Sequence, residues 1–122
     1  MIRIKRLIKS FKYAFSGLRS LIKKEQNFRV HIIASIFVLF LSVYFNIKVW
    51  EWALVVLMIA MVLILEMMNT VFERFVDMLK PRVHQYVKEI KDVMSAVVFV
   101  ASITSIIIGL IIFLPYILRI WG

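Results

Sequence analysis

The sequence contains no cysteine, three glycines and two prolines among its 122 residues. Without cysteine the chain can form neither a disulfide nor a zinc–thiolate site, and it has no thiol nucleophile. Gly17, Gly109 and Gly122 are too widely separated for a Walker loop or a dinucleotide-binding fingerprint, because both motifs need clustered glycines. The sequence therefore excludes the nucleotide-binding sites that depend on a glycine-rich loop.

Acidic residues are scarce as well, since seven Asp and Glu accompany sixteen Lys and Arg, which gives a net charge of +9. Hydrophobic residues make up 63% of the chain and charged residues 19%, whereas a soluble domain is about half apolar and about a quarter charged. The composition indicates an integral membrane protein. In such a protein basic residues gather on the cytoplasmic side and contact anionic lipid, so we expect no nucleic-acid partner.

Three apolar stretches are candidates for membrane-spanning helices. Val30–Ile47 has no charged residue over 18 positions, and Val93–Leu118 has none over 26. Both are long enough, because about 20 helical residues cross the hydrocarbon core. Trp52–Leu65 is uncharged over 14 positions and reaches the required length only if its helix continues past Glu66. The sequence thus predicts an all-α membrane protein with three transmembrane helices within about residues 29–118.

Residues 1–28 predict a basic amphipathic helix on the cytoplasmic membrane surface, within one domain of residues 1–122. Its apolar positions recur at helical spacing: Ile4, Leu7, Ile8, Phe11, Ala14, Phe15, Leu18 and Ile22. Most Lys and Arg of this segment lie off that stripe. The charged part is too long for a signal peptide, and no small-x-small cleavage site follows it.

Lys and Arg are distributed unequally between the segments that flank the spans. Nine precede the first span and five lie within 73–92, whereas Lys48 stands alone between the first two spans and Arg119 follows the third. The positive-inside rule therefore places the N-terminus and the second loop in the cytoplasm and the C-terminus outside. Pro81 is expected to divide the second loop into two helical pieces.

Four polar residues, Glu66, Asn69, Glu73 and Asp77, fall within a sector of about 80° on one helix. If that helix starts at Trp52, Glu66 lies in the inner leaflet, about 9 Å short of the cytoplasmic boundary. A carboxylate in lipid costs several kcal/mol, which favours a functional role for Glu66. The alternative is an Asn–Glu pair that holds helices together.

Other polar residues are expected near the same interface. Glu25 and Glu73 would suit Mg²⁺ if they converge, because this metal binds few carboxylates and completes its shell with water and phosphate oxygens; either could also be a solvated charge. Lys91 lies just before the third span and could bind phosphate or act as an anchor. His84 is a possible metal ligand or general base. His31, near the start of the first span, is interpreted as a polar residue at the membrane interface.

These residues together resemble a known family. The segment 66–77 reads Glu-Met-Met-Asn-Thr-Val-Phe-Glu-Arg-Phe-Val-Asp, and Lys91-Asp92 follows it. This Glu-x-x-Asn-x-x-x-Glu core with a later Lys-Asp, in so small a protein, is similar to the bacterial diacylglycerol kinase and undecaprenol kinase family. The resemblance extends over about residues 6–118, and Asn27-Phe28-Arg29 is more like the undecaprenol kinase branch.

The resemblance implies a homotrimer in the bacterial inner membrane that transfers the γ-phosphoryl group of ATP, with Mg²⁺, to a lipid hydroxyl. The site would lie at the cytoplasmic interface between subunits. The implied residues are Glu66 and Asn69 for catalysis; Glu25 and Glu73 for Mg²⁺; Arg6, Tyr13, Glu25, Glu73, His84, Lys91 and Asp92 for ATP; and Arg19, Asn27, Arg29, Glu66 and Ser95 for the lipid. Val71, Val93 and Met94 depart from the family, which usually has small residues there.

Two other functions remain as alternatives. A small proton-coupled transporter would use Glu66 as its proton site, but it needs that residue near the midplane of the bilayer. A structural subunit or pore would leave the acids and Lys91-Asp92 without a role. We therefore expect a lipid kinase that acts on undecaprenol, with diacylglycerol as the second candidate, because both lipids offer a hydroxyl to the same carboxylate.

Overall fold

The structure is a computed structural model that describes residues 1–79 and 84–121, with the backbone alone for His84. Its described residues form α1 (Ile4–Lys24), α2 (Gln26–Tyr44), α3 (Val49–Asp77) and α4 (His84–Trp121), and no strand. α2, α3 and α4 are long and apolar enough to cross a membrane. These helices confirm the predicted all-α class with one additional N-terminal helix. The break expected at Pro81 lies outside the described residues.

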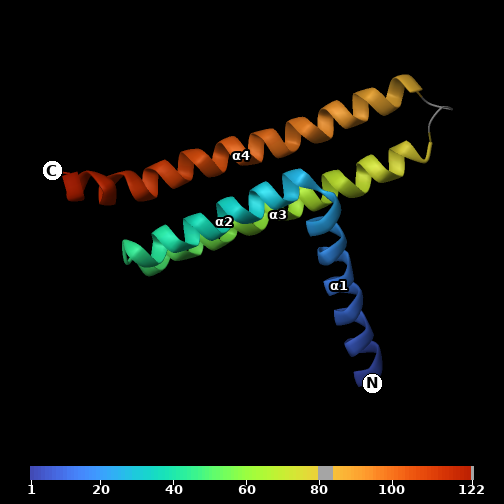
Figure 1. Ribbon diagram of the computed structural model, residues 1–122, viewed down its shortest axis with the longest axis horizontal. Helices are drawn as coiled ribbons and strands as arrows, with labels where there is room; N and C mark the ends of the chain where they lie inside the picture. Colours follow the sequence, from blue (N-terminus) through green and yellow to red (C-terminus); the bar gives the residue numbers. More distant parts are fainter. Residues whose placement is uncertain (80–83, 122) are drawn as a thin grey trace.

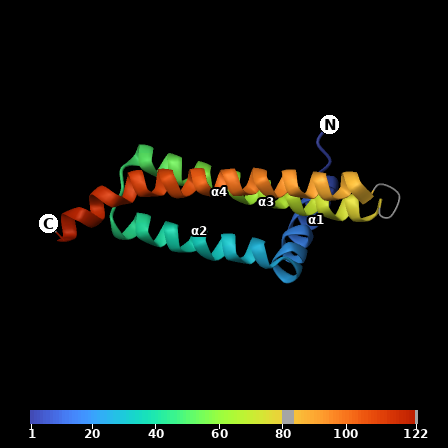
Figure 2. The same cartoon turned by 90° about the horizontal axis from the view of Figure 1, so that it is seen from above.

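The three candidate spans run side by side, and α1 projects crosswise from one end of the bundle (Figure 1). α3 packs against both α2 and α4, and the view from above shows α2 along one side of the α3–α4 pair (Figure 2). α3 and α4 have 29 and 38 residues, or about 44 and 57 Å. Because the hydrocarbon core is about 30 Å thick, both helices extend beyond it.

α1 ends at Lys24, before the expected boundary at residue 28, because Glu25 has an extended backbone with φ −111° and ψ 110°. The carbonyl groups at the end of α1 have hydrogen-bond partners. The Glu25 amide donates to Leu21 O at 2.9 Å. Arg29 Nη1 donates to Ile22 O at 3.0 Å and to Lys23 O at 2.9 Å. A residue of α2 therefore caps α1 and fixes the corner between the two helices.

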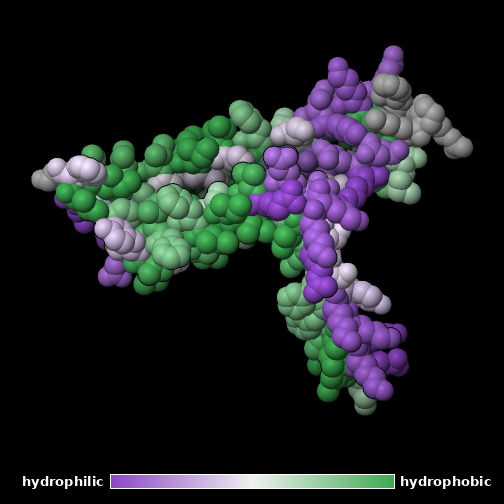
Figure 3. All heavy atoms as spheres, viewed as in Figure 1, coloured by the Kyte–Doolittle hydropathy of each residue, from purple (hydrophilic) through white to green (hydrophobic). Residues whose placement is uncertain are grey.

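Hydrophobic side chains cover most of the bundle, and polar ones gather over α1 and the end of the bundle where α1 joins (Figure 3). The same view shows that α1 has two sides that run along its length. Its apolar side faces the direction in which the apolar bundle extends, and its polar side faces the opposite direction. Leu7, Phe11 and Phe15 are among its exposed apolar side chains. A bundle that crosses a membrane would therefore carry α1 along one interface with these side chains toward the lipid.

The opposite end of the bundle is closed by a tight turn between α2 and α3. Asn46 adopts φ 51° in this turn, a left-handed conformation that asparagine tolerates better than most residues. Glu51, which is buried, accepts a hydrogen bond from the Lys48 amide at 2.9 Å and another from the Tyr116 hydroxyl of α4. Pro115 lies within α4, whose C-terminal part turns away from the helix axis (Figure 2).

Candidate active site

Glu66 lies near the middle of α3 and is 3% exposed. Its Oε2 atom is 3.5 Å from Nε2 of His31, which belongs to the second turn of α2. The Thr70 hydroxyl donates to the Glu66 backbone carbonyl at 3.1 Å. Among the described residues, His31 is the one basic side chain within ion-pair distance of this carboxylate. The carboxylate is thus enclosed between α2 and α3, where it could accept the proton of a substrate hydroxyl.

Asn69 follows Glu66 on the same face of α3 and is 7% exposed. Its Nδ2 donates a long hydrogen bond to Glu73 Oε1 at 3.5 Å. Its Oδ1 is buried and has no hydrogen-bond partner within the part of the chain that the structure describes. Buried polar atoms are nearly always paired in folded proteins, so this oxygen is available to a molecule that the site binds.

Glu25 brings a third carboxylate to this end of α3. Its Oε1 is 3.1 Å from Nη2 of Arg74, the residue after Glu73, and both side chains are partly exposed. Glu73 precedes Arg74 and accepts a hydrogen bond from Asn69, on the face of α3 that carries Glu66. The structure therefore brings Glu25, Glu66 and Glu73 into one neighbourhood, although they come from the corner between α1 and α2 and from two turns of α3.

Within residues 1–79 and 85–121, no group of three or more His, Asp and Glu side chains is close enough to hold a metal ion by itself. Mg²⁺ does not require such a group, because it commonly binds one or two carboxylates together with water and substrate phosphates. Glu25 and Glu73 offer such ligands, and the unpaired Asn69 Oδ1 offers a further oxygen. These residues fit an ion that arrives with a nucleotide.

α4 contributes cationic and polar groups on the other side of α3. Lys91 Nζ is 2.5 Å from Asp77 Oδ1, so the last turn of α3 holds this lysine. Asp92 and Ser95 are exposed on α4, whereas the ion-pair partner of Glu66 comes from α2. His84 begins α4, and its side chain lies outside the described part of the chain.

The residues expected from α1 lie on a helix that adjoins Glu25 only at its C-terminal end. Arg6 and Tyr13 are exposed and belong to the portion of α1 that projects away from the bundle (Figure 1). Arg19 is also exposed, and Asn27 is exposed at the start of α2. Arg29, expected near the lipid headgroup, caps the end of α1 as described above.

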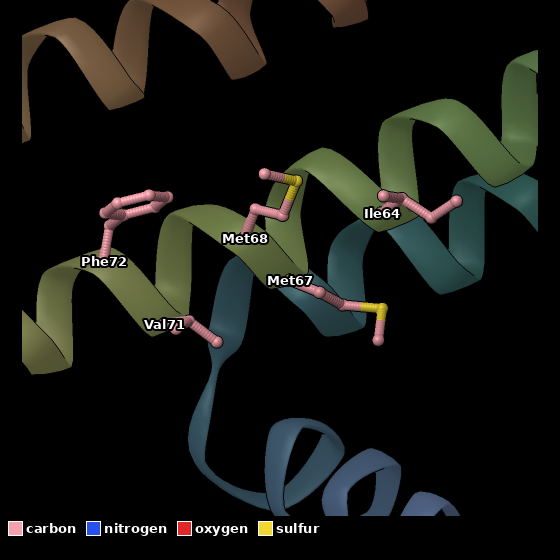
Figure 4. Close-up of a pocket in the computed structure, with 5 residues that line it drawn as sticks. All are labelled: Ile64, Met67, Met68, Val71 and Phe72. Atoms are coloured by element: carbon pink, nitrogen blue, oxygen red, sulfur yellow. The ribbon is translucent and has the colours of Figure 1, made fainter.

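The face of α3 opposite Glu66 is apolar, and most of its side chains are exposed. A shallow hollow of about 310 Å³ is lined by Ile64, Met67, Met68, Val71 and Phe72. Met67 and Val71 lie on one side of it, and Met68 and Phe72 on the other (Figure 4). Val71 is 65% exposed and Val93 is exposed on α4. Two of the three residues that depart from the family are thus exposed in the single chain, and the third, Met94, is half-buried.

A larger pocket of about 350 Å³ lies between α2, α3 and α4, with His31 among its lining residues. Its remaining lining is mostly apolar, with Ser35, Ser102 and Ser105 as further polar positions. The pocket is therefore bordered by His31, the residue that contacts Glu66.

Sequence reasoning missed two contacts of this region and one at the opposite end of α3. It interpreted His31 as an interface residue, and it assigned no role to Arg74 or to the Glu51–Tyr116 pair. The one signal available for His31 was its place as the sole ionisable side chain, tyrosine aside, in an otherwise uncharged span.

The chain is similar to known membrane lipid kinases. The family model described as prokaryotic diacylglycerol kinase matches residues 12–113, which include Glu25, Glu66, Asn69 and Glu73. An undecaprenol kinase of Bacillus subtilis is 35% identical over 112 residues, covering 92% of this chain and 91% of that protein. A diacylglycerol kinase of Synechocystis is 30% identical over 110 residues, covering 89% and 63%. A diacylglycerol kinase of Escherichia coli is 28% identical over 102 residues, covering 84% of each chain.

Proposed function

Because this chain belongs to the prokaryotic diacylglycerol kinase family and is a membrane lipid kinase, we propose that it transfers the γ-phosphoryl group of Mg-ATP to a lipid hydroxyl at the cytoplasmic interface. The observation that carries this proposal is the buried Glu66 with Asn69 and Glu73 on the same face of α3. Phosphoryl transfer needs mainly positioning and neutralisation of phosphate charge, so a glycine-rich loop is dispensable.

Glu66 is the general base of this proposal. The lipid hydroxyl oxygen forms a bond to the γ-phosphorus, the bond from that phosphorus to the β–γ bridging oxygen breaks, and the hydroxyl proton passes to the Glu66 carboxylate. Glu66 is about 26 Å along α3 from Val49, which places it near the inner edge of a core about 30 Å thick. A lipid hydroxyl resides at that depth, so the bilayer itself contributes to positioning the substrate.

Glu25 and Glu73 are the proposed ligands of Mg²⁺, which supplies neutralisation of the phosphate charge when bound. Asn69 positions the reacting groups through its unpaired Oδ1. Nucleotide binding would also use cationic and polar groups from both flanking helices. They are Arg6, Tyr13, His84, Lys91 and Asp92.

Undecaprenol is the proposed lipid, and diacylglycerol is the second candidate. The Bacillus protein named undecaprenol kinase is 35% identical to this chain, against 30% and 28% for the two diacylglycerol kinases above. The headgroup region would be lined by Arg19, Asn27, Arg29 and Ser95, all of which are exposed.

The active form is proposed to be a homotrimer in the bacterial inner membrane, with the N-terminus in the cytoplasm and the C-terminus outside. Three spans leave the apolar hollow on α3 open, and Arg6 and Tyr13 are exposed on α1, which projects from the bundle (Figure 1). Neighbouring subunits would supply both the missing cover and the missing cations. The excess of Lys and Arg before the first span supports the orientation.

The test is phosphorylation of undecaprenol and of diacylglycerol in parallel, in mixed micelles with ATP and Mg²⁺, by the purified protein. We expect a higher kcat/KM for undecaprenol, and we expect Glu66→Gln and Glu73→Gln each to lower it by about 100-fold or more. Glu51→Gln, at the opposite end of α3, serves as the control that keeps activity. Transport of protons or solutes that proceeds without ATP and requires Glu66 would instead support a transporter.

A further inference from the structure

A general base must lose the proton it has accepted before the next turnover, and the position of Glu66 makes this step difficult. Its side chain is 4% exposed. The neighbouring polar side chains on α3 are engaged elsewhere, because the Thr70 hydroxyl donates to a backbone carbonyl and Asn69 Nδ2 donates to Glu73. The proton therefore needs a carrier between this carboxylate and water.

His31 has the geometry of such a carrier. Its Nε2 lies 3.5 Å from Glu66 Oε2, and its side chain is 23% exposed, so it is more accessible than the carboxylate that it contacts. The Ser35 hydroxyl donates to the His31 backbone carbonyl at 2.7 Å. Contacts of catalytic groups are often long without substrate and shorten when it binds, so 3.5 Å is compatible with a working hydrogen bond.

We infer that His31 orients the Glu66 carboxylate and carries its proton away after each phosphoryl transfer. This inference rests on the kinase function proposed above. The proton that Glu66 takes from the lipid hydroxyl moves from Oε2 to the lone pair of Nε2, in the tautomer that carries its hydrogen on Nδ1. The imidazolium then releases one proton from Nδ1 to water, and a return to the first tautomer restores the starting state. No electron transfer is involved.

A purely structural pair between α2 and α3 is the alternative, and the kinetic constants separate the two roles. Loss of a proton carrier lowers kcat and leaves KM for ATP and for the lipid nearly unchanged, because neither substrate contacts His31 in this scheme. Loss of a structural pair lowers stability and affects both constants. Imidazole in solution can replace a missing carrier but cannot replace a missing structural contact.

The experiment compares His31→Ala and His31→Gln with the wild-type protein, with and without added imidazole. We expect kcat to fall about 100-fold in both variants, the usual scale of assisted proton transfer, with each KM within about twofold of wild type. Imidazole should restore part of kcat in His31→Ala, which leaves space for it. It should have no effect on His31→Gln, whose amide fills the space and cannot relay a proton.

Three outcomes would overturn the inference: wild-type kcat in either variant, a loss of activity in His31→Ala that imidazole does not restore, or a loss confined to KM. Far-UV circular dichroism of His31→Gln establishes that a slow variant is folded. Glu66→Gln is assayed in parallel. Full activity of Glu66→Gln would refute the proposed kinase mechanism itself, whereas an inactive Glu66→Gln beside a fully active His31→Ala would refute the role of His31 alone.

Discussion

Replacement of Glu66 by glutamine tests whether this buried acid is retained for chemistry or for stability. The side chain is almost isosteric, so the change removes the negative charge without opening a cavity. If the carboxylate serves catalysis, Glu66→Gln should abolish phosphoryl transfer and raise the free energy of unfolding. If Glu66 instead holds α2 and α3 together through His31, the same change should lower the free energy of unfolding.

The expected size of this effect follows from the depth of Glu66. An acid at the centre of a transmembrane helix costs about 3 kcal/mol on insertion scales, and the cost falls toward the interface. Glu66 is about 26 Å from the start of α3, so it lies about 4 Å from the inner edge of a core about 30 Å thick. We therefore expect Glu66→Gln to increase the free energy of unfolding by about 1 kcal/mol.

Glu51 provides the matched control on the same helix. It is also buried, but its carboxylate accepts hydrogen bonds from the Lys48 amide and the Tyr116 hydroxyl. Glu51→Gln should therefore lower stability and leave kcat/KM unchanged. Thermal unfolding in detergent, followed by far-UV circular dichroism, measures both variants. A destabilised Glu66→Gln, or the same sign of change in both variants, would refute the reasoning.

Three further predictions concern the packing around the site. Phe28 is 1% exposed, so Phe28→Ala should lower the free energy of unfolding by about 3 kcal/mol or more and Phe28→Leu by less than half as much, measured by thermal unfolding. Arg29→Ala removes both hydrogen bonds that cap α1, so amide hydrogen exchange of residues 20–24 should accelerate. Arg29→Lys should not restore the protection, because the lysine ammonium lacks the planar geometry of guanidinium. Arg74→Gln frees Glu25, so half-maximal activity should need less Mg²⁺; an unchanged Mg²⁺ titration would contradict a role for Glu25 in metal binding.

The helices themselves were predictable, because each leaves a local signature in the sequence. Long uncharged runs marked the three candidate spans, and the apolar stripe that includes Leu7 and Phe11 marked α1. The continuation of α3 past Glu66 also followed from length, since the uncharged part alone was too short to cross a membrane. The exact end of α1 at Lys24 has no local signature, because the cap that terminates it comes from Arg29 on the next helix.

The contacts between helices were not predictable, because a span that is apolar around most of its circumference does not specify which face meets its neighbour. His31 is 35 positions from Glu66, and Arg74 is 49 positions from Glu25. Such pairs depend on how far α2 slides along α3, and the tight turn at Asn46 sets that register. Sequence patterns could therefore indicate which residues carry the chemistry but not which partners they meet.

The carboxylates and the proposed nucleotide-binding groups lie on different parts of the chain, and this arrangement has a consequence for catalysis. The three carboxylates are held within one chain by packing and by pairs to His31, Asn69 and Arg74. Of the proposed nucleotide-binding groups, Arg6 and Tyr13 are instead exposed on α1 and Asp92 on α4, whereas Lys91 is half-buried and paired with Asp77. Proton transfer therefore depends on contacts that a single subunit already makes. In the proposed homotrimer, neighbouring subunits complete the nucleotide-binding surface, so variants at subunit contacts should raise KM for ATP more than they lower kcat.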